Sequence, residues 1–85
     1  MKRFIFVVKE KIGIHARPAS QLVRKAAAYK SAITIEKDGK SADVKRLIAL
    51  MALGVQCGEK VTFMIEGEDE EIAAVQLEEY CNHNL

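Results

Sequence analysis

The sequence of 85 residues is poor in several features that mark whole classes of proteins. It has no tryptophan and only 6% aromatic residues, so it lacks the interleaved aromatic and basic residues typical of nucleic-acid binding surfaces. Its two cysteines, Cys57 and Cys81, do not have the paired spacing of a zinc site. No segment approaches the roughly 20 apolar residues of a membrane span. We therefore expect no nucleic-acid partner, no bound metal and no membrane insertion.

The N-terminal segment lacks the length of a secretion signal. Its basic start is followed by only five apolar residues, Phe4–Val8, whereas a signal peptide carries an apolar stretch of about 7–15 residues and a small-residue cleavage site. We therefore expect a cytoplasmic protein, in which Cys57 and Cys81 stay reduced.

The composition that is present is that of a small globular protein, with 49% hydrophobic and 29% charged residues. A chain of this length predicts a single domain, residues 1–85, whose thin core leaves its chemistry at the surface. The charge is uneven. Residues 1–46 hold twelve Lys/Arg and four Asp/Glu, a balance of +8, whereas residues 47–85 hold one Lys and eight Asp/Glu, a balance of −7. The basic half is suited to an acidic protein or a phosphate.

Apolar periodicity predicts seven elements of secondary structure. Strands are expected at Arg3–Val8, Ser31–Lys37, Lys40–Asp43 and Glu59–Glu66, and helices at Ala16–Tyr29, Lys45–Leu53 and Glu68–Asn82. Asp38-Gly39 is a hairpin turn signal. The order β-α-β-β-α-β-α favours an α+β domain with one sheet covered on one face by helices, although the pattern does not give the strand order.

The buried faces follow from the same periodicity. The first helix is expected to bury Ala19, Leu22, Val23, Ala26 and Ala27, and the last helix Ala73, Ala74, Leu77, Tyr80 and Cys81. In the strands, alternate residues are expected to point inward, among them Phe4, Phe6, Val8, Ile33, Ile35, Val61, Phe63 and Ile65.

The stretch Gly13-Ile14-His15-Ala16-Arg17-Pro18-Ala19 places a histidine directly before a predicted helix. Pro18 fits the first turn, where no amide N–H is needed. The unpaired N–H groups of that turn, those of Ala16 and Arg17, make this helix end an anion site. They and the Arg17 guanidinium would stabilise a phosphoryl group on His15. The pattern suits reversible phosphoryl transfer to the histidine ring.

No second catalytic group accompanies His15, because the sequence has no phosphate-binding glycine loop, metal cluster or spaced carboxylate pair. This favours a carrier over an autonomous enzyme. Local physics alone leaves open that His15 is an ordinary capping histidine and Arg17 an ordinary surface arginine. The other histidine, His83, lies in a polar C-terminal segment that we expect to be frayed.

The stretch from Gly13 to Ala19 resembles the active-site signature of the HPr family of histidine phosphocarriers. The resemblance covers the whole chain, since the family's hairpin, second conserved segment and start of its fourth strand match Asp38–Ser41, Lys45–Gly54 and Gly58–Val61. It implies an open-faced β-sandwich, in which a four-stranded antiparallel sheet is covered on one face by three helices.

The resemblance also implies a function and a set of docking residues. In the bacterial phosphoenolpyruvate-sugar phosphotransferase system, His15 would be phosphorylated on Nδ1 by enzyme I. The phosphoryl group would then pass to IIA domains or proteins of sugar permeases, with no cofactor and with the carrier acting as a monomer. The family docks through its first two helices, which implicates Ser20, Gln21, Arg24, Leu47, Ile48 and Met51.

Arg46 departs from the family pattern. Many members from low-GC Gram-positive bacteria carry here a serine that an ATP-dependent kinase phosphorylates, which inhibits transport and recruits a catabolite-control transcription factor. Arginine has no hydroxyl and does not mimic phosphate. The resemblance therefore supports transport phosphotransfer and leaves serine-based regulation in doubt.

Two alternatives remain open for this sequence. One is a carrier of a nitrogen-related phosphotransferase branch. The other is a regulatory module that controls partners by docking alone, against which the presence of both His15 and Arg17 argues.

Overall fold

A computed structural model of the protein describes residues 1–85. Its elements, in chain order, are β1 (Lys2–Val7), α1 (Ala16–Ala26), β2 (Ala32–Lys37), β3 (Lys40–Asp43), α2 (Leu47–Ala52), β4 (Lys60–Glu66) and α3 (Glu70–Asn84). This order confirms the seven elements predicted from periodicity.

The four strands form one antiparallel sheet in the order β1-β4-β2-β3. The strand nearest the C-terminus is thus inserted beside the first strand, an arrangement that the local pattern did not give. The turn between β2 and β3 is the predicted hairpin, in which Asp38 (φ 51°) and Gly39 (φ 81°) both adopt the positive φ of a type I′ turn.

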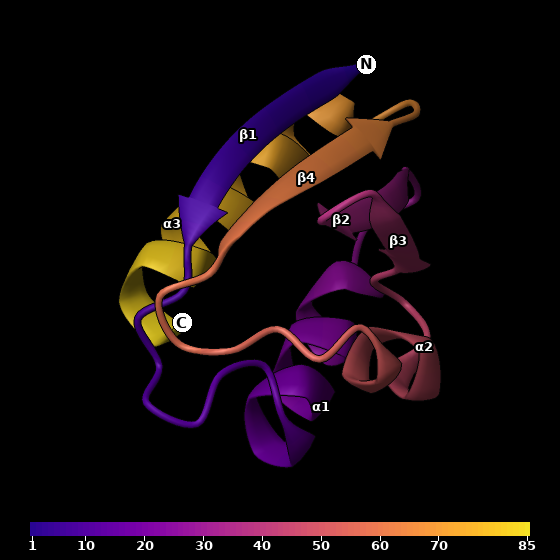
Figure 1. Ribbon diagram of the computed structural model, residues 1–85. Helices are drawn as coiled ribbons and strands as arrows, with labels where there is room; N and C mark the ends of the chain where they lie inside the picture. Colours follow the sequence, from indigo (N-terminus) through magenta and orange to yellow (C-terminus); the bar gives the residue numbers. More distant parts are fainter.

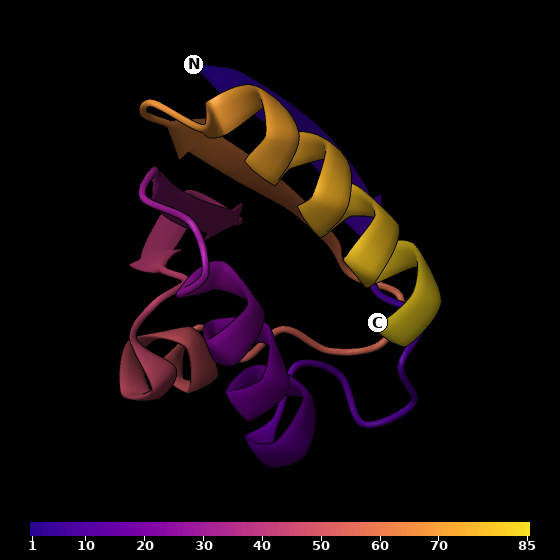
Figure 2. The ribbon, with the colours of Figure 1, turned by 180° about the vertical axis from the view of Figure 1, so that it is seen from behind.

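The helices cover one face of the sheet. Figure 1 shows α3 behind β1 and β4, and α1 and α2 together beside the end of the sheet; Figure 2, seen from behind, shows α3 running along β1 and β4. Successive side chains of a strand point to opposite faces of the sheet. Phe6 and Ile35 point to the covered face and are buried, whereas Ile5 and Val7 point to the open face and are exposed. The structure therefore confirms the open-faced, four-stranded sandwich with three helices.

The core lies between the sheet and the helices. Each helix contributes a leucine with no exposed surface, Leu22 from α1, Leu50 from α2 and Leu77 from α3. The ring of Phe63 in the central strand stacks on Phe4 with their centroids 4.8 Å apart. Of the side chains expected inside, Ala27 is exposed because α1 has already ended. Four others are only partly buried, namely Phe4, Val23, Ala74 and Tyr80.

Two helices begin later than predicted, and in each case an aspartate before the helix accepts hydrogen bonds from backbone N–H groups. Asp43 accepts the N–H of Lys45 through its carboxylate and that of Arg46 through its carbonyl, so α2 begins at Leu47. Asp69 accepts hydrogen bonds from the N–H groups of Lys30 and Ser31, and α3 begins at Glu70.

The end of α1 also differs from the prediction of Tyr29. After Ala26 the N–H groups of Ala28 and Tyr29 each bond to the carbonyl three residues earlier, which tightens the chain into turns.

The C-terminal segment is ordered, contrary to the expected fraying. His83 belongs to α3, and Leu85 is buried. A backbone oxygen of Leu85 accepts hydrogen bonds from the N–H groups of Lys9 and Glu10, and so holds the start of the loop that leads to His15. No helix in the structure has the length and apolar character needed to span a membrane.

Candidate functional site

The loop before α1 is held by a close backbone contact with the loop after α2. Gly13 adopts a φ of +72°, and a Cβ at this position would overlap the Val55 carbonyl oxygen and lie 2.8 Å from the Cα of Gln56. The next N–H, that of Ile14, donates to the same carbonyl at 3.0 Å, and the Ile14 side chain is buried. Glycine is thus needed both for its conformation and for the approach of the two loops.

The second loop is held in turn by Glu59. Its carboxylate accepts the Gln56 N–H at 2.7 Å and the Lys37 ammonium at 3.1 Å, and these two contacts lower the pKa of Glu59. The same ammonium donates to the Gly54 carbonyl at 3.1 Å. Both loops that border His15 are therefore fixed by contacts distant in the sequence.

His15 is the N-cap residue of α1. Its backbone is extended (φ −118°, ψ −166°), and its Nδ1 accepts the Ala16 N–H at 2.9 Å. Since an accepting Nδ1 carries no proton, this atom has the lone pair that a nucleophile requires. The side chain is exposed, so the ring is accessible to another protein.

The first turn of α1 has a defined set of donors. The Ala16 N–H is bound to the histidine ring, the Ala19 N–H to the His15 carbonyl at 2.6 Å, and Pro18 has no N–H. The Arg17 N–H has no acceptor within the protein, and the exposed Arg17 guanidinium makes no hydrogen bond or ion pair. A free amide and a free guanidinium therefore stand beside Nδ1, the arrangement of an anion site.

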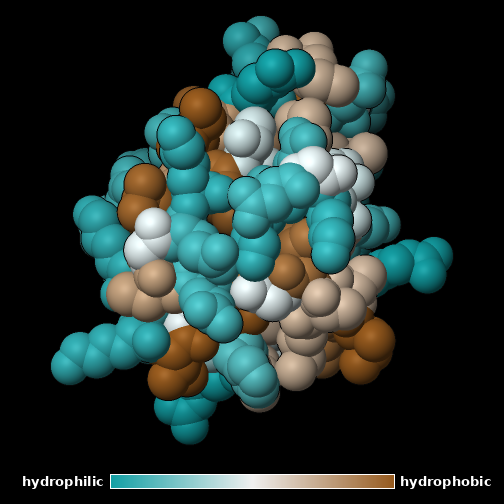
Figure 3. Space-filling view, in the orientation of Figure 1, coloured by the Kyte–Doolittle hydropathy of each residue, from teal (hydrophilic) through white to brown (hydrophobic).

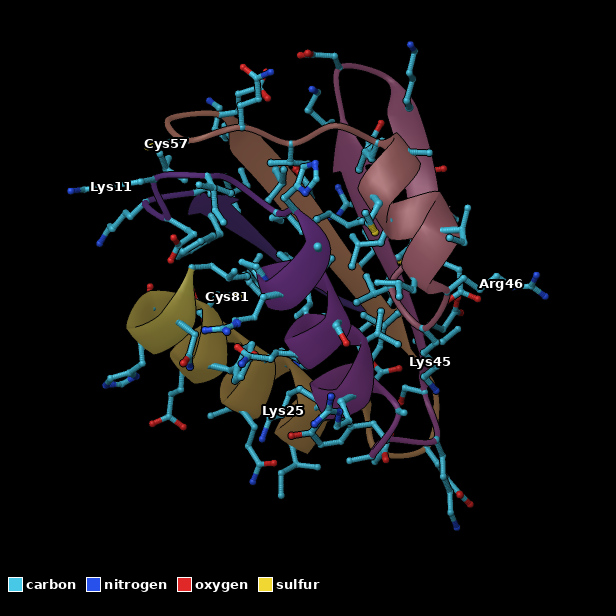
Figure 4. The ribbon with its side chains drawn as sticks, turned by 90° about the horizontal axis from the view of Figure 1, so that it is seen from below. Lys11, Lys25, Lys45, Arg46, Cys57 and Cys81 are labelled. Carbon is cyan, nitrogen blue, oxygen red and sulfur yellow. The ribbon has the colours of Figure 1, made fainter.

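A shallow depression of about 340 Å³ adjoins His15, and the two loops and the end of α2 form its walls. Figure 4 shows Lys11 and Cys57 close together at this end of the molecule. The depression is lined by Lys11, Ile12, Ile14, His15, Met51, Gly54, Val55, Gln56 and Cys57. Sequence analysis did not connect Lys11 or Gln56 with His15, and the only signal was the glycines around each loop.

The six residues expected to dock partners lie on α1 and α2 and differ in exposure. On α1, Gln21 and Arg24 are exposed and Ser20 is half-buried. On α2, Ile48 is 78% exposed, whereas Leu47 and Met51 pack partly against the core. Figure 3 shows hydrophobic side chains gathered over α2. The apolar part of this surface is therefore centred on Ile48.

The second histidine has the opposite ring arrangement. His83 Nδ1 lies 2.7 Å from the Glu79 carbonyl oxygen, which can only accept, so this nitrogen donates. His83 lies near the end of α3, about three and a half turns of helix from the N-terminus of that helix. It therefore has no helix N-terminus beside it.

The thiols also differ. Cys81 is buried, and burial raises its pKa to about 12, with Glu78 adding to the effect. Cys57 is exposed, and its sulfur lies 3.7 Å from the Lys9 carbonyl oxygen. No group of three or more His, Cys, Asp or Glu residues is placed to hold a metal ion.

Comparison with known proteins places these features in a family. The family model described as "PTS HPr component phosphorylation site" matches residues 2–83. A phosphocarrier protein HPr from Borreliella burgdorferi is 51% identical over 73 residues, which cover 86% of this chain and 85% of that protein. The HPr-like protein Crh from Bacillus subtilis is 41% identical over 78 residues, 92% of either chain.

Solved structures agree with the sequence relatives. The crystal structure of HPr-C-His from Thermoanaerobacter tengcongensis superposes with a TM-score of 0.94 at 38% identity, over 99% of this chain and 94% of that one. Together with the histidine at the start of α1, these similarities show that the chain belongs to the HPr family, the phosphocarrier proteins of the phosphotransferase system.

Proposed function

We propose that His15 accepts a phosphoryl group from phosphorylated enzyme I and passes it to IIA components of sugar permeases. The observation that carries this proposal is the unprotonated Nδ1 of an exposed N-cap histidine, beside a free amide and a free guanidinium. In this proposal residues 1–85 act as a single HPr domain in the cytoplasm.

The transfer step follows from the groups at the start of α1. The Nδ1 lone pair attacks phosphorus, the bond from phosphorus to the donor breaks, and its electron pair leaves with the donor. Because Nδ1 accepts the Ala16 N–H in the unphosphorylated protein, the ring must give up this bond before it attacks. The Ala16 and Arg17 N–H groups and the Arg17 guanidinium then donate to the phosphoryl oxygens.

The site supplies a nucleophile and stabilising charges but no general acid, base or metal. The remaining chemistry therefore comes from the donor and acceptor proteins, which cover His15 while the phosphoryl group moves. This supports a carrier rather than an enzyme that turns over a substrate alone. Docking on α1 and α2 brings the exposed Ile48, Gln21 and Arg24 into contact with these proteins.

The test is phosphorylation with enzyme I and labelled phosphoenolpyruvate. We expect acid-labile, base-stable label on His15 and no label on His15→Ala. The control variant His83→Ala should be labelled fully, because it removes only the histidine whose Nδ1 is a donor. Unchanged labelling of His15→Ala would overturn the assignment of the nucleophile. Absence of label on the unaltered protein would overturn the phosphocarrier role.

A regulatory docking module is the second candidate, favoured by the similarity to Crh. The crystal structure of Crh, a B. subtilis catabolite repression protein that forms a domain-swapped dimer, superposes with a TM-score of 0.78 at 36% identity. The same labelling assay separates the two candidates, because a module that acts by docking alone takes up no phosphate. Size-exclusion chromatography of the protein tests the expected monomer.

A further inference from the structure

A second, larger hollow lies between α1 and α3, at the edge of the surface formed by α1 and α2. Its volume is about 500 Å³, and it is lined by Gln21, Arg24, Lys25, Ala28, Tyr80 and Asn84. Gln21, Arg24 and Lys25 of α1 follow the spacing i, i+3 and i+4, so they share one side of that helix, and Ala28 lies in the turn after it. In Figure 4, α1 lies between α3 and α2, and Lys25 lies on the side of α1 toward α3.

The hollow is lined by positively charged side chains and a hydroxyl donor that have no carboxylate partner in the protein. Neither Arg24 nor Lys25 forms an ion pair, and the Lys25 ammonium is held 5.7 Å above the ring of Tyr29. The Tyr80 hydroxyl has no hydrogen-bond partner. Burial raises the pKa of this hydroxyl, with the Cys81 thiol adding to the effect and Arg24 opposing it, so the hydroxyl remains a donor at neutral pH. No Asp or Glu lines the hollow.

The position of the hollow is continuous with the proposed docking surface. Gln21 and Arg24 belong to both, and Arg17 and Arg24 are seven residues apart and therefore on the same side of α1. Along the helix, Arg24 lies roughly 13 Å from His15. A standard interface covers about 800 Å² of each partner, a disc of roughly 16 Å radius. A protein centred on His15 thus reaches the hollow.

We infer that the α1–α3 hollow receives a carboxylate side chain of the enzyme I molecule docked on His15, an inference that rests on the proposed function. The carboxylate would pair with Arg24 and Lys25 and accept a hydrogen bond from the Tyr80 hydroxyl. Its charge complements the hollow, and α3 thereby becomes part of the docking surface, together with α1 and α2. Lys25 and Tyr80 are docking residues and take no part in the transfer step.

The experiment measures KM and kcat for phosphorylation of the full chain by enzyme I in three variants. Lys25→Glu should raise KM about 5- to 10-fold and Tyr80→Phe about 3-fold, with kcat within two-fold of the unaltered protein, because both remove contacts of binding only. The matched control is Lys30→Glu, which makes the same charge change five residues later, at an exposed side chain near Glu68. It should leave KM within two-fold.

Each outcome decides a separate point. If the unaltered protein takes up no phosphate, the proposed function fails whatever the hollow does. If it is phosphorylated but Lys25→Glu and Tyr80→Phe leave KM unchanged, the hollow does not dock enzyme I. An equal rise in KM for Lys30→Glu would also overturn the inference, since net charge would then explain the effect. Circular dichroism of each variant shows that the compared proteins are folded.

Discussion

The helices α1 and α2 begin in nearly the same way but present different groups at their N-termini. Each follows an N-cap residue in extended conformation, His15 with φ −118° and Arg46 with φ −116°. His15 accepts a backbone N–H through Nδ1, whereas the Arg46 side chain caps nothing and its Nε lies 3.9 Å from the Asp43 carboxylate. One helix start therefore offers a lone pair and the other a cation.

The difference teaches that free N–H groups at a helix end do not by themselves make a phosphoryl site. Every helix has such groups. At α1 a nucleophile lies directly before them, a free guanidinium lies after it, and Gly13 fixes the approach of the preceding loop. At α2 the residue in the corresponding place has no nucleophilic atom and carries the charge that a helix N-terminus disfavours.

The largest contrast between the two helix starts should appear with two phosphoryl donors. We expect an HPr serine kinase with ATP to leave position 46 unmodified, because a guanidinium has no hydroxyl for ester formation, while enzyme I still labels His15. Arg46→Ser restores the hydroxyl and should make the protein a substrate. Mass spectrometry of both versions locates the modified residue. Efficient ATP-dependent modification of the unaltered protein at Ser41 would show that serine-based regulation survives by another route.

The loop before α1 should be sensitive to a single methyl group. Gly13→Ala places a Cβ against the Val55 carbonyl and forces a left-handed conformation on alanine, which should lower the free energy of unfolding by roughly 2–4 kcal/mol. Gly39→Ala is the matched control, since φ there is +81° but nothing lies within 4 Å of the added Cβ. It should cost only about 1–2 kcal/mol. If urea unfolding shows the same loss of unfolding free energy for Gly13→Ala and Gly39→Ala, the contact between the two loops contributes nothing to stability.

The positive charge after the nucleophile should affect transfer and not stability. Arg17→Ala removes a group that has no partner in the protein, so the unfolding midpoint should stay within about 2 °C. Phosphorylation by enzyme I should slow roughly 10- to 100-fold, less than the loss of a buried preorganised donor causes, because this guanidinium is exposed. The rate for Arg17→Lys should lie between those of the unaltered protein and Arg17→Ala, because lysine keeps the charge but lacks the planar guanidinium with its paired donors. A normal rate for Arg17→Ala would remove Arg17 from the site.

Much of this architecture follows from local sequence signals, and the parts that do not are contacts between distant segments. Alternation in the strands predicts the inward-facing Ile35 and Phe63, and Asp38-Gly39 predicts the hairpin. Periodicity does not reveal that β4 inserts beside β1, because strand pairing depends on the summed packing of the whole sheet.

The candidate site likewise has a part that local sequence signals predict and a part that depends on contacts between distant segments. His15, Arg17 and Pro18 are adjacent in the sequence and are predictable as a helix start with an anion-binding character. The loop that meets them through Val55 is some forty residues away, and its glycines are the only sequence signal of that contact. The hollow beside Tyr80 is likewise invisible in the sequence, since it depends on how α3 packs against α1.

The smallest expected effect concerns the start of α2 itself. Arg46→Ser replaces an uncapped cation with a residue whose hydroxyl accepts an N–H of the first turn, in the extended conformation that an N-cap needs. Removing the cation from the helix N-terminus gains about 0.3–1 kcal/mol, and the cap adds a similar amount. The lost contact with Asp43 offsets part of this gain, although an exposed pair at 3.9 Å contributes little. The net result should be a stabilisation of roughly 1 kcal/mol, about 4–8 °C in the unfolding midpoint of a chain this size. Arg46→Ala, which removes the charge without a hydroxyl, separates the two contributions. If both variants are less stable than the unaltered protein, the pair with Asp43 holds the turn before α2 more strongly than its geometry indicates.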